Sequence, residues 1–208
     1  MYCQRSRRCD GKLKMKRIFL WLCIGVTLLG LSACGNLGGT DEKETETGSV
    51  LVAYFSCTGT TKAVAEKISE MLEADLHEIV PEEAYTAEDL NYGDDSSRTS
   101  REQNDESSRP QIRGRVENME DYDVIFLGYP IWWGKAPHIM RTFVETYDLA
   151  GKEIVPFCTS GSSGIGNSAE ELSELSAETV QWREGRRFDE NTSEEELEEW
   201  IDGLNLRR

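Results

Sequence analysis

Cysteine is scarce in the part of the sequence that has the composition of a folded domain. The 208-residue chain has six cysteines, but only Cys57 and Cys158 lie beyond residue 34. Each comes at the end of an apolar segment, and a strand placed between these segments would separate them by about 9.5 Å. That distance is too long for an unstrained disulfide, and two cysteines supply neither a disulfide framework nor metal-ligand spacing. We therefore expect two independent thiols.

Basic residues are also few, with 23 Lys and Arg against 39 Asp and Glu and a formal net charge of −16. Seven basic residues and one acidic residue precede residue 35, so the remainder carries a charge of −22. Such a charge argues against nucleic acid and anionic lipid as ligands of the protein surface. It suits a basic protein partner, or it serves solubility alone.

No apolar run is long enough to cross a membrane as a mature helix. The longest, Ile18–Leu31, has about 14 residues, follows a short basic stretch, and is typical of the apolar region of a signal peptide. Leu31–Cys34 then resembles a bacterial lipobox, which implies cleavage before Cys34 and lipidation of its thiol. An ordinary secretory signal and an N-terminal anchor helix are the alternatives.

The sequence thus divides into three parts. Residues 1–34 form the predicted lipoprotein signal peptide, although residues 1–14 fit no part of one and Met15 is the better start. Residues 35–48 are small, polar and acidic, as is typical of a flexible tether. Residues 49–208 have the size of one domain. This organisation predicts a protein anchored in the cell membrane through Cys34, on the extracytoplasmic side.

Apolar segments alternate with helical patterns along the predicted domain. Strands are predicted at residues 50–55, 76–80, 124–129, 154–158 and, more weakly, 179–182. Helical spacing follows the first strand, and further helices are predicted over residues 134–147, 169–175 and 193–204. Alternation of this kind implies a parallel sheet with right-handed crossovers, and continuous apolar strands fit burial on both faces. We predict an α/β doubly wound sandwich with a five-stranded parallel sheet in the order 2-1-3-4-5, in which ligands bind beyond the carboxyl ends of strands 1 and 3.

Residues 82–120 depart from this alternation, because they are polar and contain few aliphatic side chains. Short helical turns are predicted at about 86–91 and 97–105, but a full amphipathic helix is not. Loops of this length are usually functional or disordered. We interpret the segment as a long excursion that replaces a regular crossover helix.

A hydroxyl-rich turn follows the first strand and leads directly into a helix. Its candidate binding residues are Ser56, Cys57, Thr58, Gly59, Thr60 and Thr61. The first N–H groups of a helix lack partners and the helix dipole favours anions, so this turn predicts a phosphate site. Without Lys or Arg it differs from a P-loop and favours a terminal monophosphate held by neutral donors. The alternative is simple capping of the helix, but four hydroxyls exceed that need.

Two further loops follow the third and fourth strands. The first carries two indoles at a strand-to-helix turn, where at least one could stack on a flat aromatic ligand unless both belong to the core. The second is rich in Ser and Gly, so it either lets the main chain approach a ligand or is a flexible connector. The candidate residues are Pro130, Ile131, Trp132, Trp133, Gly134, Thr159, Ser160 and Gly161. His138 follows closely and is expected to be structural, with a proton-donor role left open.

Two motifs in these loops carry a family resemblance. Tyr54–Thr61 resembles the flavodoxin phosphate loop, Ser/Thr-x-Thr-Gly-x-Thr. Gly128–Pro137, together with Ser97-Arg98 and Arg109-Pro110, resembles one bacterial flavodoxin-like subfamily whose members are often lipoproteins. The resemblance extends from residue 50 to residue 204. It implies a flavodoxin-like fold and FMN as the cofactor, with the first loop on the phosphate and the other two loops along the isoalloxazine ring and the ribityl chain.

The resemblance also implies a redox function. We expect an FMN-binding protein that transfers electrons to or from a redox protein partner or a small-molecule acceptor at the cell envelope. Two departures from electron-carrier flavodoxins, the Pro-Ile-Trp-Trp-Gly loop and the excursion at residues 82–120, leave an alternative open. That alternative is an FMN-dependent NAD(P)H:quinone-type oxidoreductase. A scaffold that has lost the flavin is a third hypothesis.

Overall fold

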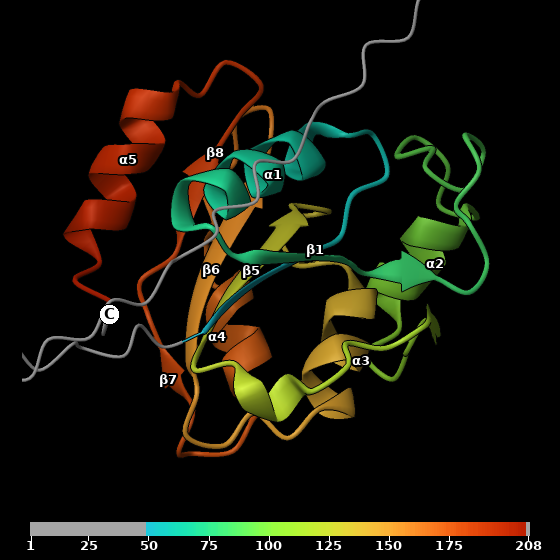
Figure 1. Cartoon of the computed structure of the whole chain (residues 1–208). Coiled ribbons are helices and arrows are strands. Elements are labelled where there is room, and N and C mark those ends of the chain that lie inside the picture. Colours follow the sequence, from blue (N-terminus) through green and yellow to red (C-terminus); the bar gives the residue numbers. More distant parts are fainter. Residues whose placement is uncertain (1–48, 207–208) are drawn as a thin grey trace, which may run out of the picture. The chain divides into compact units, whose positions relative to one another are not determined.

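A parallel sheet forms the centre of the computed structural model, which describes residues 49–206 (Figure 1). The strand order is β2-β1-β5-β6-β7, and all these neighbours pair in parallel. The strands are β1 (Val50–Tyr54), β2 (Asp75–Glu78), β5 (Val124–Pro130), β6 (Glu153–Thr159) and β7 (Gln181–Trp182). The predicted order 2-1-3-4-5 is therefore confirmed. The predicted signal peptide, lipidated Cys34 and tether lie outside the described residues.

Helices cover both faces of the sheet, as Figure 1 shows. One face packs against α1 (Thr60–Leu72) and α5 (Glu194–Gly203), and the other against α3 (His138–Thr146) and α4 (Ser168–Ser173). Side chains of a strand point alternately to the two faces. Accordingly, Val52 belongs to the core under α1 and α5, whereas its neighbours in β1 belong to the core under α3. Within residues 49–206, no helix is both long and apolar enough to cross a membrane.

The fifth strand differs from the prediction of one edge strand at residues 179–182. Two short strands share its place, since β7 pairs with the start of β6 and β8 (Arg186–Phe188) with its end. Pro156 lies between the two paired regions of β6 and has no N–H to continue the ladder. Gly185 passes so close that an added Cβ would lie 3.0 Å from the Pro156 carbonyl oxygen. Pro156 therefore accounts for the break between β7 and β8. The apolar pattern of residues 154–158 does not reveal it, because proline fits within an apolar run.

Residues 75–121 also correct the prediction in part. The expected second strand ends at Glu78, and β3 (Val80–Pro81) instead pairs antiparallel with β4 (Ile112–Arg113). The excursion between them contains α2 (Arg98–Asn104), close to the predicted helical turn at 97–105, and residues 86–91 form a single helical turn, as predicted, with the Leu90 N–H donating to the Thr86 carbonyl oxygen. A 3-10 turn, η1 (Met119–Asp121), precedes β5. This excursion takes the place of a crossover helix, as expected.

Gly128 in β5 has no room for a side chain, because an added Cβ would overlap the buried ring of Phe157 in β6. That ring is enclosed by Phe188 and Trp200 and has little freedom to move. We expect Gly128→Ala to lower the free energy of unfolding by about 1–3 kcal/mol, measured by urea denaturation. Gly203→Ala is the control, since an added Cβ there meets nothing within 4 Å. Equal stability of the two variants would contradict the tight contact.

Candidate functional site

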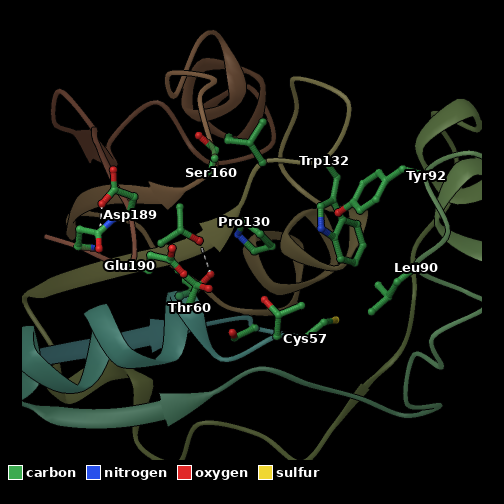
Figure 2. Close-up of a pocket in the computed structure, with 16 residues that line it drawn as sticks. Cys57, Thr60, Leu90, Tyr92, Pro130, Trp132, Ser160, Asp189 and Glu190 are labelled. Atoms are coloured by element: carbon green, nitrogen blue, oxygen red, sulfur yellow. Dashed lines mark hydrogen bonds between the residues drawn. The ribbon is translucent and has the colours of Figure 1, made fainter.

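A cavity of about 530 Å³ lies at the carboxyl ends of β1, β5 and β6 (Figure 2). Residues 56–58, 60–61, 130–132 and 159–161 contribute most of its lining. Leu90 and Tyr92 of the excursion and residues 189–191 complete it. The cavity therefore occupies the point where the strand order reverses, which is the position expected for a ligand in a doubly wound sheet.

The hydroxyl-rich turn presents an uncapped helix end to this cavity. The N-cap of α1 is Gly59, whose φ of 92° lies in the left-handed region, and no side chain caps the helix. The Ser56 hydroxyl instead accepts a hydrogen bond from the Gly59 N–H at 3.1 Å. Simple capping by a hydroxyl is thus not realised, and the first N–H groups of α1 remain available to an anion.

Thr61 joins the first loop to the third. Its Oγ1 lies 2.8 Å from Oγ1 of Thr159, and both side chains are buried. Arg187 of the edge strand β8 also holds the third loop. Its guanidinium donates to the carbonyl oxygens of Ser160 at 2.7 Å and Gly161 at 3.2 Å. These bonds hold Ser160 and Gly161 at the border of the cavity. This part of the Ser- and Gly-rich loop is therefore not a flexible connector.

Cys57 lines the cavity but is a poor candidate for thiolate chemistry. Desolvation by the surrounding protein raises the pKa of its thiol to about 12, although Arg98 opposes this shift. Burial raises the pKa of Cys158 to about 12 as well. Both cysteines are free, in agreement with the expectation of independent thiols.

The two adjacent tryptophans have different environments. Trp132 lines the cavity but is only 3% exposed, and its ring packs edge-on against Phe55 and Tyr85, each at 5.5 Å between centroids. Trp133 is 43% exposed, does not line the cavity, and contacts Tyr92 at 4.6 Å between centroids. Of the two indoles, only Trp132 can reach a molecule in the cavity as the structure stands.

A tight turn holds these tryptophans in place. Trp132 and Lys135 exchange two backbone hydrogen bonds of 2.9 Å, and both residues between them have positive φ, 48° at Trp133 and 79° at Gly134. This is the pattern of a type I′ turn. Gln103 of α2 secures the turn from outside, because its amide donates to the carbonyl oxygens of Trp132 at 3.1 Å and Ala136 at 3.3 Å.

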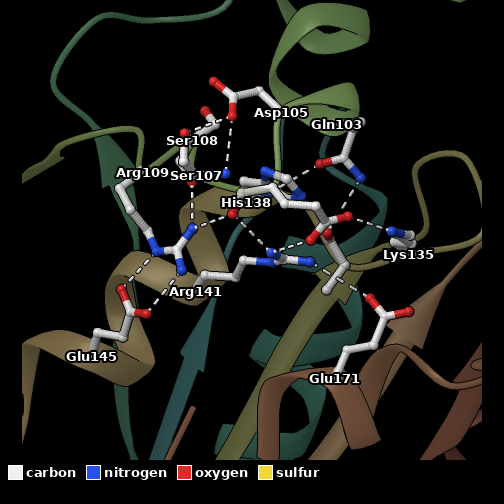
Figure 3. A network of polar contacts seen from close by, with 12 residues as sticks. Gln103, Asp105, Ser107, Ser108, Arg109, Lys135, His138, Arg141, Glu145 and Glu171 are labelled. Carbon is white, nitrogen blue, oxygen red and sulfur yellow. Dashed lines mark hydrogen bonds and ion pairs between the residues drawn. The ribbon is translucent and has the colours of Figure 1, made fainter. Parts of the chain in front are cut away.

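Ion pairs fasten the excursion to α3 next to this turn (Figure 3). Glu106 accepts from Lys135 and from Arg141, each at 2.7 Å, and these bonds lower its pKa to about 2. Arg109 forms a bidentate pair with Glu145 at 2.6 and 2.9 Å. The excursion is therefore bound to the helix that follows the two tryptophans, rather than loosely laid over it.

The structure brings most of the predicted binding residues together around one cavity. Three predicted residues do not line it: Gly59 shapes the first turn, and Trp133 and Gly134 lie on the outer turn. Sequence reasoning missed Leu90, Tyr92, Asp189, Glu190 and Asn191. Leu90 and Tyr92 are among the few apolar residues of the excursion, which is a signal that could have found them. The acidic turn that follows β8 carried no such signal.

The chemistry of the cavity is neutral to acidic. Its lining contains hydroxyls, main chain, two carboxylates and no Lys or Arg. Figure 2 shows Asp189 and Glu190 near Thr60 at one end, and Tyr92 beside Trp132 at the other. Within residues 49–206, no group of three His, Cys, Asp or Glu side chains could hold a metal ion. The donors fit an elongated ligand with a monophosphate at one end and a flat ring at the other.

Comparison with known proteins agrees with this geometry. The family model described as flavodoxin matches residues 49–204. The chain belongs to the flavodoxin family. The comparison with curated proteins found no match.

Solved structures extend the comparison. A protein of Bacteroides eggerthii named as a candidate flavoprotein is 45% identical, with 77% of this chain and 99% of that chain covered and a TM-score of 0.73. A similarly named protein of Bacteroides uniformis is 42% identical over 76% and 99% of the two chains, with a TM-score of 0.71. A flavoprotein of Lactobacillus acidophilus, solved in complex with FMN, is 22% identical over 74% and 99%, with a TM-score of 0.55. This last likeness shows the shared fold.

His138 at the start of α3 generates a prediction about pH. It is buried, does not line the cavity, and neither ring nitrogen has a partner among the described residues. Burial, with Arg141 nearby, lowers its pKa from 6.5 to about 4. The imidazole of His138 therefore binds a proton more readily in the unfolded chain than in the folded one. The free energy of unfolding should fall by about 2 kcal/mol as the pH drops from 7 to 4.5.

Urea denaturation across this range, for the wild type and His138→Leu, checks the prediction. We expect a flatter pH dependence in the variant, which has no imidazole to protonate. The carboxylate of Glu106 titrates lower, since its folded pKa is about 2, so its contribution is lost mainly below pH 4.5. Identical slopes in the two proteins would show that His138 is not the titrating group.

Proposed function

We propose that this member of the flavodoxin family binds FMN and transfers electrons to or from a redox partner at the cell envelope. The observation that carries the proposal is the uncapped N-terminus of α1, which faces a cavity with aromatic side chains at its opposite end. An FMN molecule has the matching order of groups, a terminal phosphate, a polyol chain and a planar ring. When bound, the flavin would supply the electron-transfer chemistry, and the protein supplies binding, orientation and electrostatics.

The residues of the chain divide this task among three loops. The N–H groups that open α1, with the hydroxyls of Thr58 and Thr60, would hold the phosphate through neutral donors. Pro130–Trp132 and Thr159–Gly161 would border the polyol and the ring, since both segments line the same cavity. The Thr61–Thr159 bond keeps the first and third loops at a constant spacing.

Electrostatics favour an electron carrier over an NAD(P)H:quinone-type oxidoreductase. FMN has a single phosphate, which the N–H groups that open α1 can hold, whereas a nicotinamide dinucleotide carries more than one phosphate, and basic side chains usually neutralise them. The lining of this cavity has no basic side chain and includes Asp189 and Glu190. The oxidoreductase remains the second candidate because Trp133 and Tyr92 leave aromatic surface exposed beside the cavity.

Charge and the N-terminal sequence extend the proposal to partner and location. From residue 35 onward the chain has a net charge of −22, which suits a basic redox protein through long-range attraction. The lipobox-like sequence ending in Cys34 supports a lipid anchor on the extracytoplasmic side of the membrane.

The phosphate assignment can be tested with Thr58→Ala and Thr60→Ala. Each should weaken FMN binding about tenfold, because a hydrogen bond to a charged oxygen is lost. Binding of riboflavin, which lacks the phosphate, should not change in either variant. Thr146→Ala is the control, since that hydroxyl bonds within α3. Fluorescence quenching of the flavin measures both ligands, and unchanged FMN affinity would remove the assignment.

The redox role can be tested by an anaerobic reductive titration of the purified FMN-loaded protein, followed by absorbance. A carrier should be reduced by dithionite but not by NADH or NADPH. Steady oxidation of NAD(P)H in the presence of a quinone would instead establish the oxidoreductase. A colourless protein that fails to quench added FMN would refute both.

A further inference from the structure

Two aromatic side chains stand out on the surface beside the cavity. Only three large hydrophobic side chains within residues 49–206 are exposed, namely Leu76 at 42%, Tyr92 at 54% and Trp133 at 43%. Tyr92 and Trp133 touch each other, with ring centroids 4.6 Å apart and an interplanar angle of 41°. Tyr92 also lines the cavity, whereas Trp133 does not. The pair therefore forms a small aromatic wall at the cavity mouth, with Tyr92 on the inner side.

The backbone under Trp133 indicates that its side chain is placed there for a reason. Its φ of 48° lies in the left-handed region, which bulky residues rarely adopt. Asn or Gly would adopt the first central position of such a turn more easily. An indole kept at a strained position is a feature of functional sites when the surrounding structure holds it. Here the reciprocal bonds of Trp132 and Lys135, and the amide of Gln103, hold it.

Trp132 is less suited than Tyr92 to cover a ligand. Trp132 is only 3% exposed, and its ring packs edge-on against Phe55 and Tyr85. Tyr92 has more than half of its surface uncovered and faces the cavity. A planar ring that enters the cavity can therefore bury new apolar area mainly on Tyr92, with Leu90 beside it.

We propose that Tyr92 is the aromatic residue that packs against the planar ring of the bound ligand, and that Trp133 is a positioning residue for Tyr92. This inference rests on the proposed FMN function and adds a contact from the excursion, outside the three loops of the sheet. It gives residues 82–120 a role at this site. The Glu106 and Arg109 ion pairs and the Gln103 bonds anchor the segment, and the anchored segment delivers Tyr92 to the ring end.

The first test replaces Tyr92 and measures binding of FMN and riboflavin by fluorescence quenching and by the visible absorbance spectrum. Tyr92→Ala should raise both dissociation constants about fivefold to tenfold, because both ligands carry the ring. Tyr92→Phe keeps the ring and should bind as the wild type does. Leu76→Ala, a change at an equally exposed side chain away from the cavity, should have no effect.

The second test separates contact from positioning. Trp133→Asn removes the indole but suits a residue of positive φ, so the turn should persist. This variant should raise the dissociation constants of FMN and riboflavin less than Tyr92→Ala does. The double variant Tyr92→Ala with Trp133→Asn should bind as Tyr92→Ala does, since Trp133 acts through Tyr92. Additive losses would instead show that Trp133 contacts the ligand directly, and would overturn its positioning role.

The results distinguish a failure of this inference from a failure of the proposed function. A wild-type protein that does not bind FMN overturns both. A wild-type protein that binds FMN, with Tyr92→Ala of equal affinity and unchanged spectrum, overturns only the role of Tyr92. If Tyr92→Ala does not fold, Tyr92→Leu retains apolar bulk without a ring. Dissociation constants for FMN and riboflavin raised by a similar factor in that variant support the proposal, and wild-type affinity with an unchanged spectrum overturns it.

Discussion

Parallel pairing of β1, β5 and β6 is the constraint on which the site depends. It brings the carboxyl ends of the three strands to one edge of the sheet, although long stretches of sequence separate them. Each strand must then turn into a loop at that edge, and the helix after β1 begins there with unpaired N–H groups. The cavity, its hydroxyl-rich end and its aromatic end all follow from this shared edge. Removing any one of these pairings would separate the loops that line it.

Polar contacts of the excursion form the second level of organisation. A crossover helix would bury an apolar stripe, but residues 82–120 have too few aliphatic side chains for that. Much of the segment's attachment comes from Gln103, whose amide donates to two carbonyl oxygens of the turn after β5, and from the ion pairs of Glu106 and Arg109 with α3. Apolar side chains of the same segment also pack into the core under α3, among them Tyr85, Val116 and Met119. Directional bonds and these few apolar contacts together hold a segment that has no hydrophobic core of its own.

The sequence predicted the strands, their order and the three loops, because buried parallel strands leave continuous apolar runs such as Val124–Tyr129. It could not locate β8, since Arg186–Phe188 has no apolar pattern and its separation from β7 depends on Pro156 in a neighbouring strand. The division of work between Trp132 and Trp133 was equally hidden, because it depends on a turn with two positive φ angles. Tyr92 stands out in the sequence as one of the few apolar residues of the excursion, but its contact with Trp133 spans about 40 residues and is visible only in the fold.

The hydroxyl-to-hydroxyl bond between Thr61 and Thr159 has a consequence for the thermodynamics of ligand binding. It joins the first turn of α1 to the end of β6 without any contribution from a ligand, and Arg187 bonds the residues that follow. Loops ordered in advance lose little conformational entropy when a ligand enters, so more of the interaction energy is retained as affinity. Such ordering would offset part of what the anionic end lacks in basic side chains, if the ligand is the proposed FMN.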